Sequence, residues 1–364
     1  MTRERISNQQ LIIVLIIIRI IVALSKLPLI TTGTAAQDAW ASSLILGAST
    51  ILIGIIITGL GVKFPRQTII QYSQVLLGKW GGKLISLIPL WLFLQIAATD
   101  LRLYGELVKT SFLPRTPLSF ILASMVLLSA LCVYLGIEVL GRMADFVIVY
   151  FALAVISTLI IPVPEIISFN FEPVLSSGIA PVISSSLTPT AISVHLLVIG
   201  ILLPHTVEPE KGIKSVLIAV GISSLIMTLI TIIVTGKLGP VHAQHSAFPL
   251  LKTIRGIESS EFLERLEILA VLAWGLGLFI GISTFIYCGA RGLSQLLELD
   301  NYRPLVGPMA VIWVTLAMHG YDSMFQLDKF LSPEFFFPYL MGLFLLVYIP
   351  LWGAYLIRKI KYKQ

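Results

Sequence analysis

Two basic side chains lie inside the first apolar run of this chain, where a charge is costly. Lys26 follows Arg19 by seven residues, so both project from the same face of a helix. A charge at the centre of a membrane helix costs about 3 kcal/mol in insertion experiments, which makes such residues candidates for function. Lys26 could neutralise the carboxylate of an amino-acid-like ligand or take the place of a sodium ion. The structural alternatives are an acidic partner for Arg19 and snorkelling of Lys26 toward the surface.

Asp100 is an acid within the third apolar run. It lies nine residues before Lys109 at the outer end, a depth of about 13 Å at helical rise. Its carboxylate could bind a ligand ammonium group, carry a proton, or partner a basic residue of the first run. Tyr104 follows one turn later, and we place both residues in the candidate site. Arg102 and Glu106 are spaced for an intrahelical ion pair near the outer end.

Two of the apolar runs are interrupted at matching places, at Ser25–Pro28 in the first and at Gly200–Pro204 in the sixth. Irregular backbone in lipid is tolerated only where it is buried in protein or lines a cavity, so paired breaks predict a binding site between two repeats. His195 precedes the second break and could gate the site by protonation or be an ordinary hydrogen-bonded core residue. The breaks contribute Ala23, Leu24, Ser25, Lys26, His195 and Gly200 to the candidate ligand site, with the helix breaks at Pro28 and Pro204.

The eighth run opens with acidic residues. Glu264 suits the positive end of a helix, whereas Glu267 lies one turn deeper and can face the bundle. With Trp274, Glu267 could wall the ligand cavity opposite the first helix. The glycines beside Trp274 could equally serve close helix packing.

Other chemistry is absent from the sequence. His242 and His245 have no obvious third partner for zinc, and neither a phosphate-binding glycine loop nor a serine-nucleophile motif occurs. We therefore expect no metal site, no cofactor and no enzymatic activity.

The composition determines which elements position these residues. Apolar residues make up 57% of the 364 residues and charged residues only 12%, where a soluble domain would have about a quarter charged. We expect an all-α polytopic membrane protein forming a single integral-membrane domain over residues 1–364. Runs of about 20 apolar residues predict ten spans. They are Leu11–Leu29, Ala39–Leu60, Leu84–Val108, Pro117–Leu135, Ala144–Ile161, Pro189–Pro204, Ile213–Thr235, Leu263–Leu293, Pro304–Ala317 and Phe336–Ile357.

The basic residues predict the orientation. Ten spans place both termini on one side, and most lysines and arginines fall in the termini and loops of that side, so the termini are expected to be cytoplasmic. The basic residues are dispersed over short loops, which excludes a clustered nucleic-acid-binding face. We expect the apolar outer surface of the spans to contact the lipid bilayer. Breaks in spans one and six divide the chain into two halves of five spans, at about residues 8–163 and 189–358.

Three short stretches carry a resemblance to a known family. They are Phe64-Pro65 with Gln67-Thr68, Tyr72, Gly78-Lys79 and Gly82-Lys83; Gln37-Asp38-Ala39-Trp40; and Phe262-Leu263-Glu264-Arg265-Leu266-Glu267. In their order along the chain, on a ten-span plan, they resemble the permease-like B subunits of bacterial spore germinant receptors (GerAB type), a branch of the amino acid/polyamine/organocation superfamily. The resemblance covers essentially the whole chain.

The resemblance implies a five-plus-five inverted repeat of the LeuT-like type with broken helices 1 and 6. It also implies a subunit of the spore inner membrane that binds a small-molecule germinant such as an amino acid. Its expected partners are A-type and lipoprotein C-type receptor subunits. The alternative is a proton- or sodium-coupled amino acid transporter. Relatives commonly carry glycines in the first break, where this chain has Val22-Ala23-Leu24-Ser25-Lys26, so fewer exposed backbone donors are expected there.

Overall fold

The computed structural model describes residues 4–246, 248–255 and 261–361. Within those ranges its regular structure is helical, apart from one isolated parallel bridge between Ile6 and Thr206. The predicted all-α architecture is therefore confirmed. The α-helices are α1 (Asn8–Ser25), α2 (Leu27–Ala35), α3 (Ala39–Gly61), α4 (Ile69–Ser111), α5 (Leu118–Leu135), α6 (Ile137–Ile160), α7 (Ala180–Ile192), α8 (Ile199–Leu202), α9 (Gly212–Gln244), α10 (Pro249–Arg255), α11 (Glu261–Leu296), α12 (Arg303–His319), α13 (Met324–Phe330) and α14 (Pro333–Lys361).

Eight helical stretches of the described chain are long and apolar enough to cross a membrane. One of them, Leu27–Gly61, joins α2 to α3 through a short 3-10 turn, and a shorter apolar helix covers Asn8–Ile21. The predicted ninth span corresponds to α12, which has 17 residues. Each predicted span thus lies on helical chain, the first and sixth on interrupted helices, and the exact number of crossings stays a prediction.

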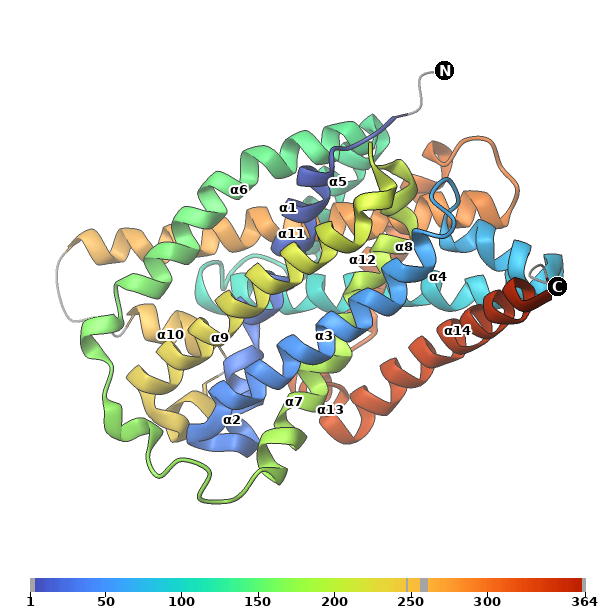
Figure 1. Cartoon of the computed structure of the whole chain (residues 1–364). Helices are drawn as coiled ribbons and strands as arrows, with labels where there is room; N and C mark the ends of the chain where they lie inside the picture. The colour runs from blue at the N-terminus through green and yellow to red at the C-terminus, as the bar shows by residue number, and fades with distance from the viewer. Residues whose placement is uncertain (1–3, 247, 256–260, 362–364) are drawn as a thin grey trace.

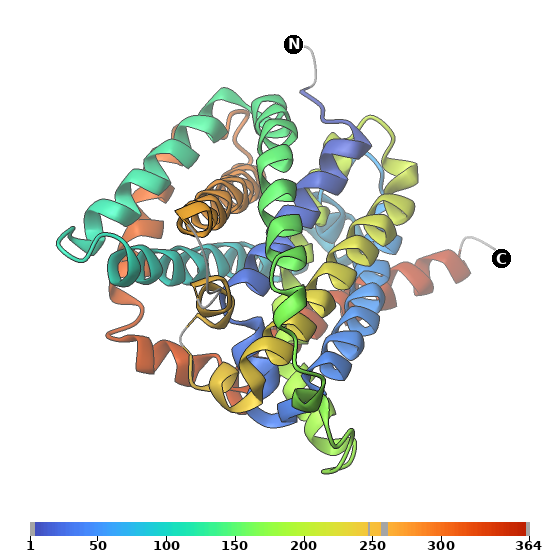
Figure 2. The same ribbon diagram turned by 90° about the vertical axis from the view of Figure 1, so that its left-hand side faces the viewer.

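The helices form an inner and an outer set (Figures 1 and 2). In the stretch Ala180–His205, 89% of the most apolar 18-residue part is buried inside the protein. The corresponding share in the stretch formed by α14 is 28%. The helix α1 is likewise inside, because it packs against α6, α9 and α11. Large apolar side chains such as Leu127, Phe146 and Ile349 remain exposed on the outer helices. The outer set therefore faces lipid, and the inner set carries the interrupted helices.

Both predicted helix interruptions are present. The first lies at Lys26, whose backbone (φ −121°, ψ −10°) leaves the helical region between α1 and α2. The second is the 3-10 stretch η4 (Ser193–Val198), which lies before the predicted position at Gly200–Pro204. Pro204 instead occupies the first turn of another 3-10 element, η5 (Leu203–His205), where the missing N–H of proline costs no hydrogen bond. The second break is therefore centred near His195.

A bend in α4 separates a short first segment from the predicted third span. Gly78 has φ +81° and ψ 168°, a conformation that favours glycine, and it divides α4 into two segments. The chain then turns so tightly that a Cβ atom on Gly82 would lie 2.3 Å from the Cα of Gln74. Lys79 and Lys83 both pair with Glu298, at 3.2 and 2.8 Å. The two glycines of the recognised motif thus build a corner, and its lysines attach that corner to the end of α11.

Candidate functional site

A small cavity lies where the two broken helices meet α4, α13 and α14. It encloses about 40 Å³. Its lining residues are Lys26, Ile30, Gln95, Ile96, Thr99, Asp100, Leu103, Ile192, His195, Phe330, Leu331, Phe336 and Leu340. A buried water needs at least about 15 Å³, so the cavity has room for a few waters, and its walls must separate before a larger molecule enters.

Asp100 and His195 form a polar pair across the cavity wall. Oδ2 of Asp100, on α4, lies 3.4 Å from Nε2 of His195, on η4, and the side chains are 17% and 5% exposed. The imidazole ring also packs beside Phe285, with ring centroids 5.4 Å apart. The pair therefore connects the third span to the second break and leaves a carboxylate facing the cavity.

Lys26 supplies the positive charge of the cavity lining. Its side chain is only 3% exposed, and its Nζ lies 2.9 Å from Oδ1 of Asp328, which belongs to α13 and is 48% exposed. The ammonium group also lies 5.8 Å from the centre of the Phe248 ring, within reach of a cation–π interaction. In place of the alternative of snorkelling, the buried ammonium forms an ion pair with a half-exposed carboxylate directly at the first break.

A layer of neutral hydrogen bonds closes another side of the cavity. The hydroxyls of Thr99 and Tyr321 lie 2.8 Å apart. Tyr339 donates to Oε1 of Gln95 at 2.7 Å, and Nε1 of Trp91 donates to the Tyr339 hydroxyl at 2.8 Å. The remaining lining is aliphatic or aromatic. The cavity therefore combines one cationic and one anionic group with an apolar wall, an arrangement that suits a small zwitterion with an apolar side chain.

Other predicted site residues lie away from this cavity. Leu24 and Trp274 line a separate apolar cavity of about 20 Å³. Tyr104 lines an apolar groove between α4, α5, α6 and α11, with its hydroxyl against Gly275. Gly200 packs on Ile69, since an added Cβ would lie 3.0 Å from that side chain.

The two prolines assigned to the breaks are both buried. Pro28 lies in the first turn of α2, and Pro204 lies in η5, the short 3-10 element that follows α8. The side chains of Ala23, Ser25 and Glu267 lie outside the described residues.

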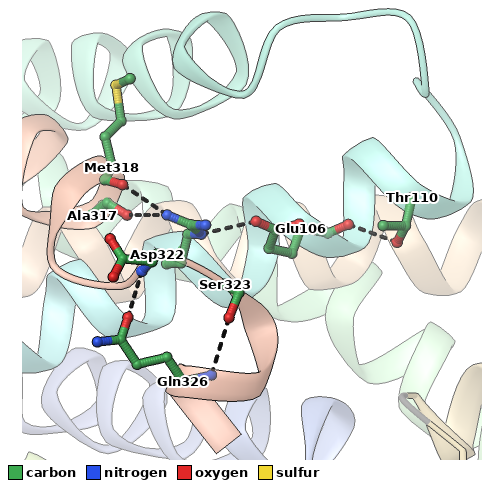
Figure 3. A network of polar contacts seen from close by, with 8 residues as sticks. Glu106, Thr110, Ala317, Met318, Asp322, Ser323 and Gln326 are labelled. Atoms are coloured by element: carbon green, nitrogen blue, oxygen red, sulfur yellow. Dashed lines mark hydrogen bonds and ion pairs between the residues drawn. The ribbon is translucent and has the colours of Figure 1, made fainter.

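Two buried arginines have structural partners. Arg19 donates from Nε to the hydroxyl of Ser223 at 2.7 Å and from Nη2 to that of Ser224 at 3.2 Å, so its partners on α9 are neutral groups and not the acid that the structural alternative assumed. Arg102 forms the predicted pair with Glu106 at 2.9 Å. It also donates to the carbonyls of Ala317 and Met318 at the end of α12 (Figure 3). This arginine therefore satisfies carbonyls left free at a helix C-terminus.

Sequence reasoning missed the residues that cover the cavity from α13 and the segments beside it. Asp328, Phe330 and Tyr321 lie outside the predicted spans, and Asp328 meets a lysine 302 positions earlier. The sequence feature that could have identified Asp328 is that it is an acidic residue in an outer loop, on the side of the protein that has few lysines and arginines.

Comparisons with known proteins identify the family. A family model described as spore germination protein matches residues 5–323. The chain belongs to this family. Among its relatives, spore germination protein KB of Bacillus subtilis (strain 168) is 33% identical over 316 residues, covering 85% of this chain and 84% of the relative. Spore germination protein YndE of the same organism is 26% identical over 320 residues, covering 86% and 87%.

The fold is also that of a solved transporter. The crystal structure of MhsT in complex with L-phenylalanine aligns with a TM-score of 0.70, covering 95% of this chain and 90% of that one at 11% identity. At this identity the match concerns the fold alone, and it confirms the predicted LeuT-like architecture. Together with the apolar helices, the family confirms the spore-germination resemblance and a multi-pass membrane protein. The relatives are germination proteins and the fold is a transporter's, so neither indicates an enzyme.

Proposed function

We propose that this protein is the membrane subunit of a spore germinant receptor and that it binds a small amino acid in the cavity between Lys26 and Asp100. The observation that carries the proposal is that a cationic and an anionic side chain, Lys26 and Asp100, both line one small and largely apolar cavity at the helix breaks. Buried charges are costly in a membrane, so their placement in a cavity favours a ligand role over a packing role.

Each part of an amino acid has a matching group. The Lys26 ammonium binds the ligand carboxylate, and the Asp100 carboxylate binds the ligand ammonium. Ile30, Ile192 and Leu340 provide the apolar wall for an aliphatic side chain. Charge-assisted hydrogen bonds at both ends orient the ligand, and they are about twice as strong as neutral ones.

Ligand binding becomes a signal only if one conformation of the protein binds better than another. The present cavity is too small for an amino acid, so binding requires the bundle to move. We propose that this movement is passed to A-type and lipoprotein C-type subunits in the spore inner membrane and triggers germination.

The same proposal places both termini in the cytoplasm. Supporting it, the N-terminal segment contacts several loops that the ten-span plan puts on the inner side. Ile6 exchanges backbone hydrogen bonds with His205 and Val207, and Glu4 pairs with Arg303 at 2.9 Å. The excess of basic residues on that side supports the same orientation.

The experiment that tests the proposal is equilibrium binding to the full chain in nanodiscs. A panel of the twenty L-amino acids is titrated against the wild-type protein and the Asp100→Asn variant. The matched control is Glu172→Gln, which neutralises an exposed acid of an outer loop. We expect saturable binding of at least one apolar amino acid that weakens in Asp100→Asn and not in Glu172→Gln. Absence of binding across the whole panel would refute the proposal.

A coupled amino acid transporter is the second candidate, favoured by the fold match to MhsT. In sealed vesicles, accumulation of a labelled amino acid driven by a proton or sodium gradient would favour it. Binding without gradient-driven accumulation would favour the receptor.

A further inference from the structure

The cation of the proposed site already has an anionic partner in the structure. Lys26 is buried at the first break, and its ammonium lies 2.9 Å from Oδ1 of Asp328. Asp328 comes from α13, outside the long apolar helices, and its side chain is 48% exposed. A half-exposed carboxylate can return to water at small cost, whereas the buried ammonium needs a replacement partner.

Asp328 belongs to a segment that covers the cavity, which we call the roof (residues 320–332). Phe330 and Leu331 of the roof line the cavity directly. The roof is attached to the transmembrane bundle through the Thr99–Tyr321 contact and through the hydroxyl of Thr188, which donates to the Leu331 carbonyl at 3.2 Å. Its internal order comes from Ser323, which caps α13 by accepting from the backbone of Gln326 (Figure 3).

The Lys26–Asp328 ion pair is an electrostatic link between the roof and the first helix break. The other described contacts of the roof with the bundle are neutral hydrogen bonds and apolar packing. Lys26 is also the one lysine or arginine in the lining of the cavity. An entering carboxylate and the Asp328 carboxylate therefore require the same ammonium group, which lines the cavity.

We propose that Asp328 is an internal competitor for Lys26, displaced by the carboxylate of the ligand, and that its displacement releases the roof. This inference rests on the proposed function and narrows the ligand class to molecules carrying a carboxylate. An amine or amide of the same shape lacks the anion that replaces Asp328. Specificity thus comes from an acid that never touches the bound ligand.

Phe248 explains why Lys26 remains in place during the exchange. Its ring centre lies 5.8 Å from the ammonium, and this contact does not depend on Asp328. Neutralising Asp328 therefore leaves the cation near its present position. The Asp328→Asn variant therefore loses the competing carboxylate and keeps Lys26 as the group that binds the ligand carboxylate.

The test measures access to the roof and ligand binding in the same protein. Leu331→Cys places a thiol in the cavity lining, and the native Cys132 and Cys288 are buried. Labelling by a membrane-impermeant maleimide is followed in nanodiscs, alone and with L-valine or L-valinamide, which differ only in the carboxylate. The background variants are Asp328→Asn, the charge-retaining Asp328→Glu, and Asp322→Asn, which neutralises an exposed acid of the same roof.

We expect Asp328→Asn to speed labelling without ligand and to tighten L-valine binding by about fivefold, the scale of one partly exposed ion pair. Asp328→Glu and Asp322→Asn should behave like wild type. L-valine should speed labelling in wild type, and L-valinamide should not. Unchanged labelling in Asp328→Asn, or equal responses to L-valine and L-valinamide, would overturn the role of Asp328. Absence of any response or binding with all twenty L-amino acids would instead overturn the proposed function.

Discussion

Replacement of Asp100 by asparagine tests which end of the ligand each charge binds. The carboxylate is 17% exposed and faces the cavity, so its interaction with a ligand ammonium is largely shielded from water. A hydrogen bond between charged groups in such a setting contributes about 2 kcal/mol, which corresponds to an approximately 30-fold rise in Kd. Asparagine keeps the shape and removes the charge.

The assay is calorimetric titration in nanodiscs with two ligands. L-valine carries both charged groups, whereas 3-methylbutanoate has the same carbon skeleton and carboxylate without the ammonium. Asp100→Asn should raise the Kd of L-valine about 30-fold and leave that of 3-methylbutanoate within about threefold, because the deleted charge has no partner there. An equal loss of affinity for both ligands would refute the assignment of the ammonium to Asp100.

Three further changes test the structure around the site, each by thermal unfolding of the purified protein. Gly82→Ala should lower stability by about 2 kcal/mol or more, on the order of an overpacked core, because the new Cβ would meet the backbone of Gln74. Gly81→Ala, whose new Cβ makes only an ordinary contact, should leave stability unchanged or raise it by up to about 1 kcal/mol, because alanine favours a helix over glycine. Equal effects of the two substitutions would contradict the tight corner. Arg102→Lys should cost about 1–3 kcal/mol through lost hydrogen bonds to carbonyls at the end of α12, and an unchanged melting temperature would contradict that role. Glu298→Gln should lower the melting temperature at neutral pH, with the difference from wild type disappearing as the pH falls below 4.5.

The sign of the Glu298 effect follows from its neighbours. Hydrogen bonds from Lys83 and Lys79 lower the pKa of the Glu298 carboxyl below its ordinary value of 4.5. A carboxyl whose pKa is lower in the folded state than in the unfolded state stabilises the fold at any pH above the unfolded-state pKa. That stabilisation is lost as the pH falls through the folded-state pKa. A difference that persists unchanged into acid would show that the stability change does not arise from the ionised carboxylate and its lysine contacts.

The sequence predicted the elements better than the details of the cavity. Apolar run length gave the helices, because a membrane span must be long and its backbone internally bonded. The cost of buried charge identified Lys26 and Asp100, and both line the cavity. Gly78 and Gly82 were recognised as motif residues, and the structure adds the physical reason for them in a sharp corner of α4.

The remaining contacts depend on tertiary geometry that spacing does not contain. Tyr104 follows Asp100 by one turn but stands about 6 Å further along the axis, where it meets Gly275 and lies outside the cavity. The second break was predicted at Gly200–Pro204, yet the helix tightens earlier, at η4. Asp328 reaches Lys26 only because the chain folds a loop over the first break. No local pattern predicts that contact.

The most direct test of the central claim is an experimental structure of the protein with the tightest-binding amino acid of the panel. We predict the ligand in the cavity between α2, α4 and η4, with its carboxylate about 2.9 Å from Nζ of Lys26 and its ammonium at a similar distance from Asp100. A ligand bound in the separate cavity beside Leu24 and Trp274, with the Lys26–Asp328 pair intact, would contradict the account.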